Sequence, residues 1–120
     1  MRVPYSVAAG ALVWVRLGGP RGFADVLALL DTGAEDVLVS RVRIAQLGLR
    51  SVGSVDEDTP GGLVSEPMYH ASLRIGDKEL GPLEVVALGE SSQADVILGR
   101  HVLSSFRVTF DGPSGWVDLT

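Results

Sequence analysis

The spacing of apolar residues predicts a chain of short strands separated by glycine-rich turns. Residues 13–17 alternate partially between apolar and polar positions and are rich in β-forming side chains, which is typical of a strand. A turn follows at residues 18–22, which include three glycines and a proline. Residues 23–30 then predict the returning strand, and the continuous apolar run at its end predicts burial on both faces.

A single helix is predicted in the first half of the chain. Ser40 is a suitable N-cap for a helix over Arg41–Leu47, because its hydroxyl can accept a hydrogen bond from a free N–H in the first turn. Gly48 would end the helix. Val42, Ala45 and Leu49 just beyond its end would lie on its apolar side.

The remaining elements are mostly strands. They are predicted at residues 37–39, 64–75, 83–88, 95–98, 107–110 and 116–119. The acidic segment 51–58 predicts a solvated loop that leads to a turn-rich tip at residues 59–63. A second polar loop is predicted at residues 90–93, and a short helix or helical turn at residues 101–106. Many short strands with one or two short helices indicate an all-β barrel or sandwich-like fold.

Composition narrows the class of protein further. A chain of 120 residues indicates one domain, residues 1–120, in which we interpret residues 1–11 as a flexible or dimer-contact segment. The net charge of −5 and the single lysine, Lys78, make nucleic acid an unsuitable partner. No apolar run approaches the roughly 20 residues of a membrane helix, so we expect no membrane partner. Cysteine is absent, which is compatible with a reducing cytosol, and we expect a cytoplasmic location.

Two motifs carry the candidate chemistry. An apolar run ends abruptly in Asp31-Thr32-Gly33-Ala34, and a second apolar run, Val96-Ile97-Leu98, is followed by Gly99-Arg100. In this order and at this separation the motifs resemble the retropepsin-like aspartic proteases. The resemblance implies a single-lobe acid-protease β-barrel with one or two short helices and a flap hairpin. It also implies an aspartic endopeptidase that hydrolyses peptide bonds.

The chemistry of this family needs two carboxylates about 3 Å apart, which hold one nucleophilic water and share one proton. Asp-Thr-Gly occurs only once in the sequence, at Asp31. One chain therefore supplies half of the site, and we expect a homodimer in which Asp31 of each chain meets across a two-fold axis. The mechanism needs no cofactor, and we expect neither a cofactor nor a metal ion.

The resemblance assigns roles to the neighbours of Asp31. Thr32 would form hydrogen bonds across the two-fold axis and tie the two loops together. Gly33 lets the substrate backbone approach closely and leaves φ unrestricted. Ala34 is small and would likewise let the substrate backbone approach closely.

A second group of residues would support the catalytic loop. Ile97, Leu98 and Gly99 would pass beneath it. Arg100 would form an ion pair with a carboxylate just after the motif, a role for which Glu35 and Asp36 are the candidates. Many cellular relatives carry aspartate after this arginine, whereas this chain has His101.

The flap is the third expected part of the site. Gly61 and Gly62 match the tip of a hairpin that closes over bound peptide, with Pro60 and Leu63 on either side. An extended peptide or protein substrate would then be held by backbone hydrogen bonds, as an added strand.

Other interpretations remain open at the level of sequence. A catalytically inactive module could use the same barrel to dimerise or to bind an extended peptide, because a fold does not determine a function. His70 and His101 lack the spacing of metal ligands and are expected at the surface. Trp116–Leu119 is the candidate interface strand, since edge strands pair with other chains.

Overall fold

In the computed structural model, residues 1–89 and 94–120 are described, so the polar loop expected at residues 90–93 lies outside the described residues. The helices are α1 (Arg41–Leu47) and α2 (Arg100–Leu103). The strands are β1 (Arg2–Ser6), β2 (Gly10–Gly19), β3 (Gly22–Leu30), β4 (Val37–Ser40), β5 (Arg50–Thr59), β6 (Gly62–Ile75), β7 (Lys78–Leu88), β8 (Val96–Leu98), β9 (Val108–Asp111) and β10 (Trp116–Leu119). The predicted all-β class with two short helices is confirmed.

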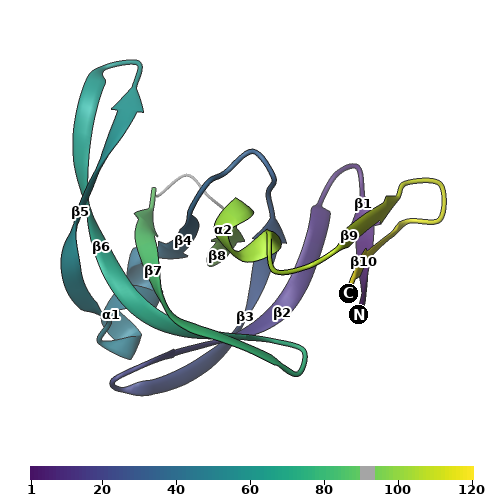
Figure 1. Ribbon diagram of the computed structural model, residues 1–120, viewed down its shortest axis with the longest axis horizontal. Coiled ribbons are helices and arrows are strands. Elements are labelled where there is room, and N and C mark those ends of the chain that lie inside the picture. The colour runs from purple at the N-terminus through teal and green to yellow at the C-terminus, as the bar shows by residue number, and fades with distance from the viewer. Residues whose placement is uncertain (90–93) are drawn as a thin grey trace.

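Six of the strands close into a barrel (Figure 1). The order β6-β7-β4-β8-β3-β2 is continuous, and a further pairing of β2 with β6 joins the two ends. Closure leaves these strands without a free edge over the paired residues. Strand β8 lies between β3 and β4, parallel to β3 and antiparallel to β4.

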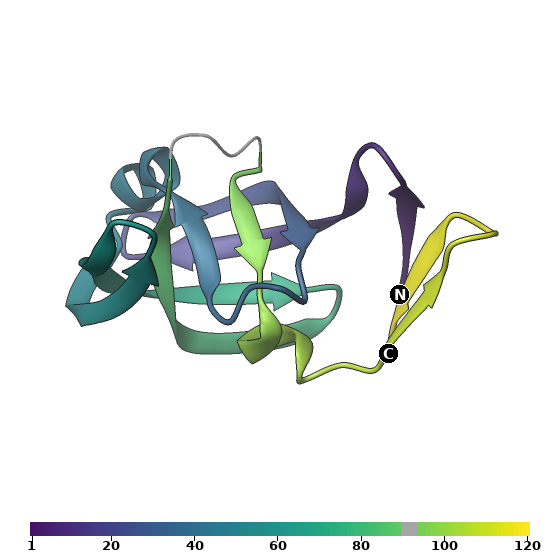
Figure 2. The same cartoon turned by 90° about the horizontal axis from the view of Figure 1, so that it is seen from above.

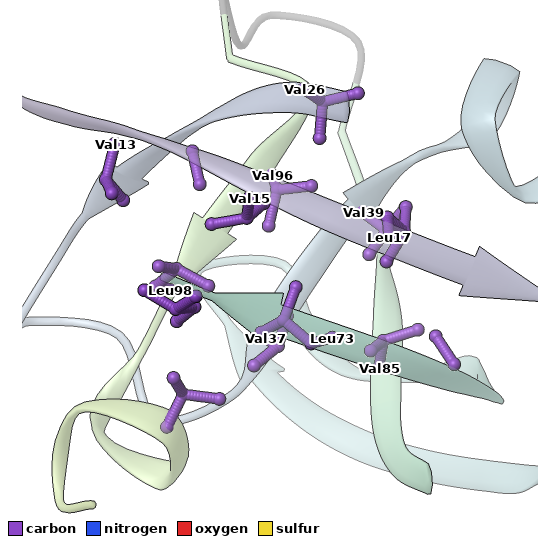
Figure 3. Close-up of a cluster of buried hydrophobic side chains, with 14 of the residues drawn as sticks. Val13, Val15, Leu17, Val26, Val37, Val39, Leu73, Val85, Val96 and Leu98 are labelled. Carbon is purple, nitrogen blue, oxygen red and sulfur yellow. The ribbon is translucent and has the colours of Figure 1, made fainter. Parts of the chain in front are cut away.

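The interior of the barrel is filled by aliphatic side chains (Figure 3). The inward positions of β2 alternate strictly, and Val13, Val15 and Leu17 are all buried. Leu17 lies opposite Leu73 of β6, at the pairing that closes the barrel. Burial of this apolar surface supplies the main driving force for folding.

Three strands, β1, β10 and β9, extend from the barrel as a terminal sheet (Figures 1 and 2), which joins the barrel where Tyr5 and Ser6 of β1 pair with β2. Strand β10 pairs with β1 on one side and with β9 on the other. Trp116–Leu119 is therefore the central strand of this terminal sheet and not the edge that the sequence suggested; the edge strand is β9. Residues 2–6, part of the segment that we interpreted as flexible or dimer-contact, form β1.

The predicted flap is a long hairpin made of β5 and β6 (Figure 1). We expected the acidic segment 51–58 to be a loop. This prediction is wrong, because the segment forms most of β5. It is held in extended form by a regular register with β6, from Asp56 opposite Ser65 to Thr59 opposite Gly62. Cross-strand pairing thus outweighs the low β-propensity of the acidic residues.

Helix α1 begins and ends where the sequence predicts. The Ser40 side chain accepts a hydrogen bond from the Arg43 N–H, and Gly48 adopts the left-handed conformation at the C-terminus. The predicted apolar side is wrong for Val42 and Ala45, which are exposed, whereas Leu49 is buried. Ile44 and Leu47, spaced by three residues, are the side chains that this helix buries.

The burial of β3 also differs from expectation. Its inward residues Val26 and Ala28 are buried, but Leu27 on the opposite face is exposed. One face of this part of β3 therefore covers the core and the other faces outward. Among residues 1–89 and 94–120, neither helix is long or apolar enough to cross a membrane.

Closure of the barrel at Leu17 yields a stability prediction. Leu17 is 0% exposed and Leu63, on the flap, is 75% exposed. We expect Leu17→Ala to lower the free energy of unfolding by about 2–5 kcal/mol, because it leaves a cavity in the core. Leu63→Ala is the matched control and should change the free energy of unfolding by less than about 0.5 kcal/mol. Urea denaturation of both variants tests this, and equal effects would contradict the assigned core.

Candidate active site

The loop that carries the predicted catalytic residue must cross another strand. Asp31 follows directly after β3, and the chain enters β4 at Val37. Because β8 lies between β3 and β4, residues 31–36 pass over the end of β8, where Gly99 begins the turn into α2. The topology therefore brings the two sequence motifs together.

Hydrogen bonds shape this loop around Asp31. The Asp31 N–H donates to the Leu98 carbonyl oxygen at 3.0 Å, which continues the pairing of β3 with β8. The Ala34 N–H donates to the Asp31 carbonyl oxygen at 3.2 Å and closes a turn. One carboxylate oxygen of Asp31, Oδ1, accepts a hydrogen bond of 2.8 Å from the Gly33 N–H. The Asp31 side chain is thus fixed by its own loop while remaining partly exposed.

Asp31 forms no ion pair with any residue in the described parts of the chain, and Thr32 beside it is exposed. A carboxylate held on a surface turn without a cation partner is free to interact with a group from outside the chain. Thr32, the next residue, is exposed, and a threonine hydroxyl can act as both donor and acceptor.

Gly99 allows the loop to cross β8. A β-carbon added at this position would lie 2.8 Å from the Ala34 carbonyl oxygen and would collide with the Asp36 carbonyl oxygen. The φ angle of Gly99 is −86°, which any residue can adopt, so glycine is required here by close backbone approach and not by φ. This explains in physical terms why an apolar strand at this place is followed by glycine.

The start of α2 binds the far side of the loop. The Arg100 N–H donates to the Ala34 carbonyl oxygen at 2.9 Å, and the His101 N–H donates to the Glu35 carbonyl oxygen at 3.0 Å. The first N–H groups of a helix have no partner within the helix. Here the loop that carries Asp31 supplies their acceptors, and the same bonds fix the loop.

The side chains of α2 differ from expectation. The Arg100 guanidinium donates to the Thr32 carbonyl oxygen at 2.8 Å and forms no ion pair within the described residues, so the expected pair with Glu35 or Asp36 is absent there. His101 instead places Nε2 3.7 Å from carboxylate oxygens of both Glu35 and Asp36. These contacts are exposed and contribute little to stability. Sequence reasoning missed this role of His101; the clue was its position on the first turn of a helix facing the loop.

The flap lies on the same side of the molecule as the catalytic loop, at the top of Figure 1. Pro60 and Gly61 form its tip, and the Thr59 hydroxyl donates to the Gly62 carbonyl oxygen at 2.7 Å. Gly62 has a φ of 109°, a conformation that favours glycine. Leu63 is exposed beside the tip and has no core to pack against.

A cavity of about 470 Å³ lies on the outward face of β2 and β3. Trp14, Leu27 and Leu29 line it, and Leu29, near the end of β3, is two residues before Asp31. Nearby, Arg16 donates two hydrogen bonds to the Asp25 carboxylate, which lower the pKa of Asp25 and raise that of Arg16. The described residues contain no cluster of three or more His, Cys, Asp or Glu suited to a metal ion.

Comparison with known proteins agrees with this geometry. The sequence profile of the family described as aspartyl protease matches residues 13–102. This span covers both motifs and the flap, and the chain belongs to this family. No curated protein sequence matches the chain significantly.

Solved structures of retropepsin-like proteases share the fold. A retropepsin-like aspartic protease from Rickettsia conorii superposes with a TM-score of 0.67 at 15% identity, over 99% of this chain and 88% of the other. EIAV protease, solved with the inhibitor HBY-793, superposes with a TM-score of 0.64 at 19% identity, over 86% of this chain and 93% of the other. Simian foamy virus protease superposes with a TM-score of 0.60 at 15% identity, over 78% of this chain and 91% of the other. The fold is therefore the single-lobe retropepsin fold.

The close approach at Gly99 generates a prediction. Gly99→Ala should displace residues 34–36 and lower the free energy of unfolding by about 1–3 kcal/mol or more, because backbone atoms block the new methyl group. Gly89→Ala is the control, since no atom of the described residues lies within 4 Å of its β-carbon position. Thermal unfolding of the two variants measures the difference. A Gly99→Ala protein as stable as the control would show that the loop does not cross β8 as described.

Proposed function

We propose that this chain is an aspartic endopeptidase that acts as a symmetric homodimer. One observation carries the proposal: a fully formed Asp31-Thr32-Gly33-Ala34 turn holds one partly exposed carboxylate, and the chain contains one such turn. Membership of the aspartyl protease family supports the reaction class. The two-carboxylate chemistry supports the dimer, because half of the required pair is present in each chain.

The reaction follows from the chemistry of paired carboxylates. Two like charges about 3 Å apart cannot both ionise at ordinary pH, so the pair holds one proton. The ionised Asp31 takes a proton from a water molecule, whose oxygen attacks the carbonyl carbon of the peptide bond. The protonated Asp31 of the other chain donates to the carbonyl oxygen. Collapse of the tetrahedral intermediate, with proton transfer to the leaving nitrogen, breaks the C–N bond.

The surrounding groups have supporting roles in this proposal. Thr32 is exposed in the single chain, and in the dimer its hydroxyl would bond to the opposite loop. Arg100 donates a hydrogen bond to the Thr32 carbonyl oxygen and so holds Thr32 in position. The flap, with Gly61 and Gly62 at its tip, would close over an extended peptide and exclude water.

The reaction class makes a direct prediction for Asp31. Asp31→Asn should reduce cleavage of an unfolded protein substrate by a factor of about 10²–10⁴ or more, because an amide can neither accept the proton of water nor donate as the acid does. Asp77→Asn, in an exposed turn far along the chain, is the control and should retain activity. Circular dichroism should show the same fold for both. If the wild type forms dimers and does not cut, the chain is a binding or dimerisation module instead.

Sharing of one proton predicts the dependence on pH. Activity should fall at low pH, when both carboxylates are protonated and no base remains. It should also fall at high pH, when the pair loses its shared proton and no acid remains. A bell-shaped profile of kcat/KM on the acidic side of neutrality is expected. A rate that keeps rising through pH 8 would exclude this mechanism.

A further inference from the structure

A second cavity, of about 420 Å³, lies beside the loop of residues 31–36, and the proposed reaction gives it no role. Its walls come from the end of that loop at Asp36, from the first turn of α2, and from the outward side of the β6–β7 hairpin at Glu84. A volume of this size is within the range of ligand sites in proteins. We call it the Asp36–Glu84 cavity.

The base of the Asp36–Glu84 cavity is apolar. Val37 and Val102 line it although they are only 1% and 3% exposed, so they form its deepest part. Leu83 and Pro82 line it from β7. A base of this kind suits the hydrocarbon stem of a long charged side chain, which packs on apolar surface while its head stays near water.

The polar groups of the cavity are two carboxylates and two imidazoles. The carboxylates belong to Asp36 and Glu84, and the imidazoles to His70 and His101. His101 Nε2 lies 3.7 Å from Asp36 Oδ1, which is longer than a hydrogen bond. Among residues 1–89 and 94–120, no donor is bonded to either carboxylate. The Asp36 side chain is only 31% exposed, so its carboxylate is partly removed from water without a bonded donor. Such a group favours a ligand that supplies N–H donors and positive charge.

The cations near the cavity leave this negative charge unbalanced. With histidine neutral at pH 7, the lining residues carry two negative charges and no positive charge. The Arg100 guanidinium is bonded to the Thr32 carbonyl oxygen. Arg50 lies opposite His70 across β5 and β6, but it does not line the cavity. A cationic ligand therefore complements the cavity in charge.

The chemistry of the lining favours a guanidinium over other cations. The described residues offer no group of three or more His, Cys, Asp or Glu that could hold a metal ion. A guanidinium is planar and always charged, and it carries several N–H donors in a fixed fork and no acceptor. It can donate to two carboxylates at once. The ammonium of lysine has fewer donors and is more strongly hydrated, so it fits a partly apolar cavity less well.

The place of the cavity in the fold limits where such a group lies in a bound peptide. Asp36 is five residues after Asp31, and a chain of that length spans at most about 18 Å. An extended peptide covers this distance in about five or six residues. An arginine side chain in the cavity would therefore belong to a residue within about six positions of the bond that is cut.

We propose that the Asp36–Glu84 cavity binds an arginine side chain of the protein substrate, outside the stretch held at the catalytic pair. The guanidinium donates to the two carboxylates, and the stem lies on Leu83 and Val102. The identity of the occupant rests on the proposed function, whereas binding of a guanidinium can be measured without cleavage. A symmetric dimer has one such cavity in each chain, so arginine is selected on either side of the cleavage site.

A titration with N-acetyl-arginine amide tests the site itself. In two-dimensional NMR spectra, the backbone amide signals of Leu83, Glu84 and Val102 should shift and reach saturation. Glu84→Gln should weaken binding by about threefold to tenfold, because it removes a charged acceptor. Glu79→Gln, on the same strand but outside the cavity, is the matched control and should bind as the wild type does.

The neutral analogue N-acetyl-citrulline amide is the matched control for the ligand. It has nearly the same shape without the charge and should bind about tenfold or more weakly than the arginine compound. Equal binding of the two compounds, no saturable shift with the arginine compound, or shifts that Glu84→Gln leaves unchanged would each overturn the proposal.

Mapping of cleavage sites tests the role in substrate selection. The wild type is incubated with a mixture of unfolded proteins, and the new chain ends are identified by mass spectrometry. Arginine should be enriched within about six residues of the cut on both sides. Glu84→Gln should lose most of this enrichment, whereas Glu79→Gln should keep it.

The outcomes separate the cavity from the catalytic function. Binding of the arginine compound that Glu84→Gln weakens, without cleavage by any sample, supports the guanidinium site and removes the protease assignment and the substrate role with it. Cleavage without enrichment of arginine overturns the substrate role and leaves the protease assignment intact.

Discussion

The crossing of the loop formed by residues 31–36 over β8 is the constraint on which this structure depends. Strand β8 lies between β3 and β4, so the segment that joins them must pass over its end. Gly99 leaves room for this passage, and the first N–H groups of α2 bind the loop carbonyl oxygens from the other side. The loop is fixed by backbone contacts from two elements, which holds Asp31 in place without an ion pair to its carboxylate. Rigid support of this kind is what a preorganised site requires.

Under the proposed function, the same arrangement supplies one half of the site. The Asp31 carboxylate is oriented by its own turn and is partly exposed beside an exposed Thr32. In the terminal sheet, the apolar residues Val108 and Phe110 of the edge strand β9 are exposed. The two features are alike, because each leaves groups that no residue among 1–89 and 94–120 covers. A symmetric partner would satisfy both, and catalysis and assembly would then depend on each other.

Much of the fold could be predicted from the sequence. Local signals were sufficient for β2, β3 and α1, since alternation, turn glycines and the Ser40 cap act over a few residues. The meeting of the two motifs was expected from family resemblance. Long-range pairing was not predictable: the acidic β5 is extended because β6 pairs with it, and β10 is central because β1 and β9 flank it. His101, and not Arg100 as expected, lies beside Glu35 and Asp36. Which of these two side chains faces the carboxylates depends on the rotation of the four-residue helix α2, and the local sequence does not determine that rotation.

The central claim is that two chains share one catalytic pair, and subunit mixing tests it most directly. Wild type and Asp31→Asn, unfolded together in equal amounts and refolded, would form dimers at random, and cleavage is then measured per total protein. Because both copies of Asp31 are needed, the account predicts about one quarter of the activity of the wild type at the same total concentration. Retention of about one half would mean that each chain acts alone, and would contradict the account.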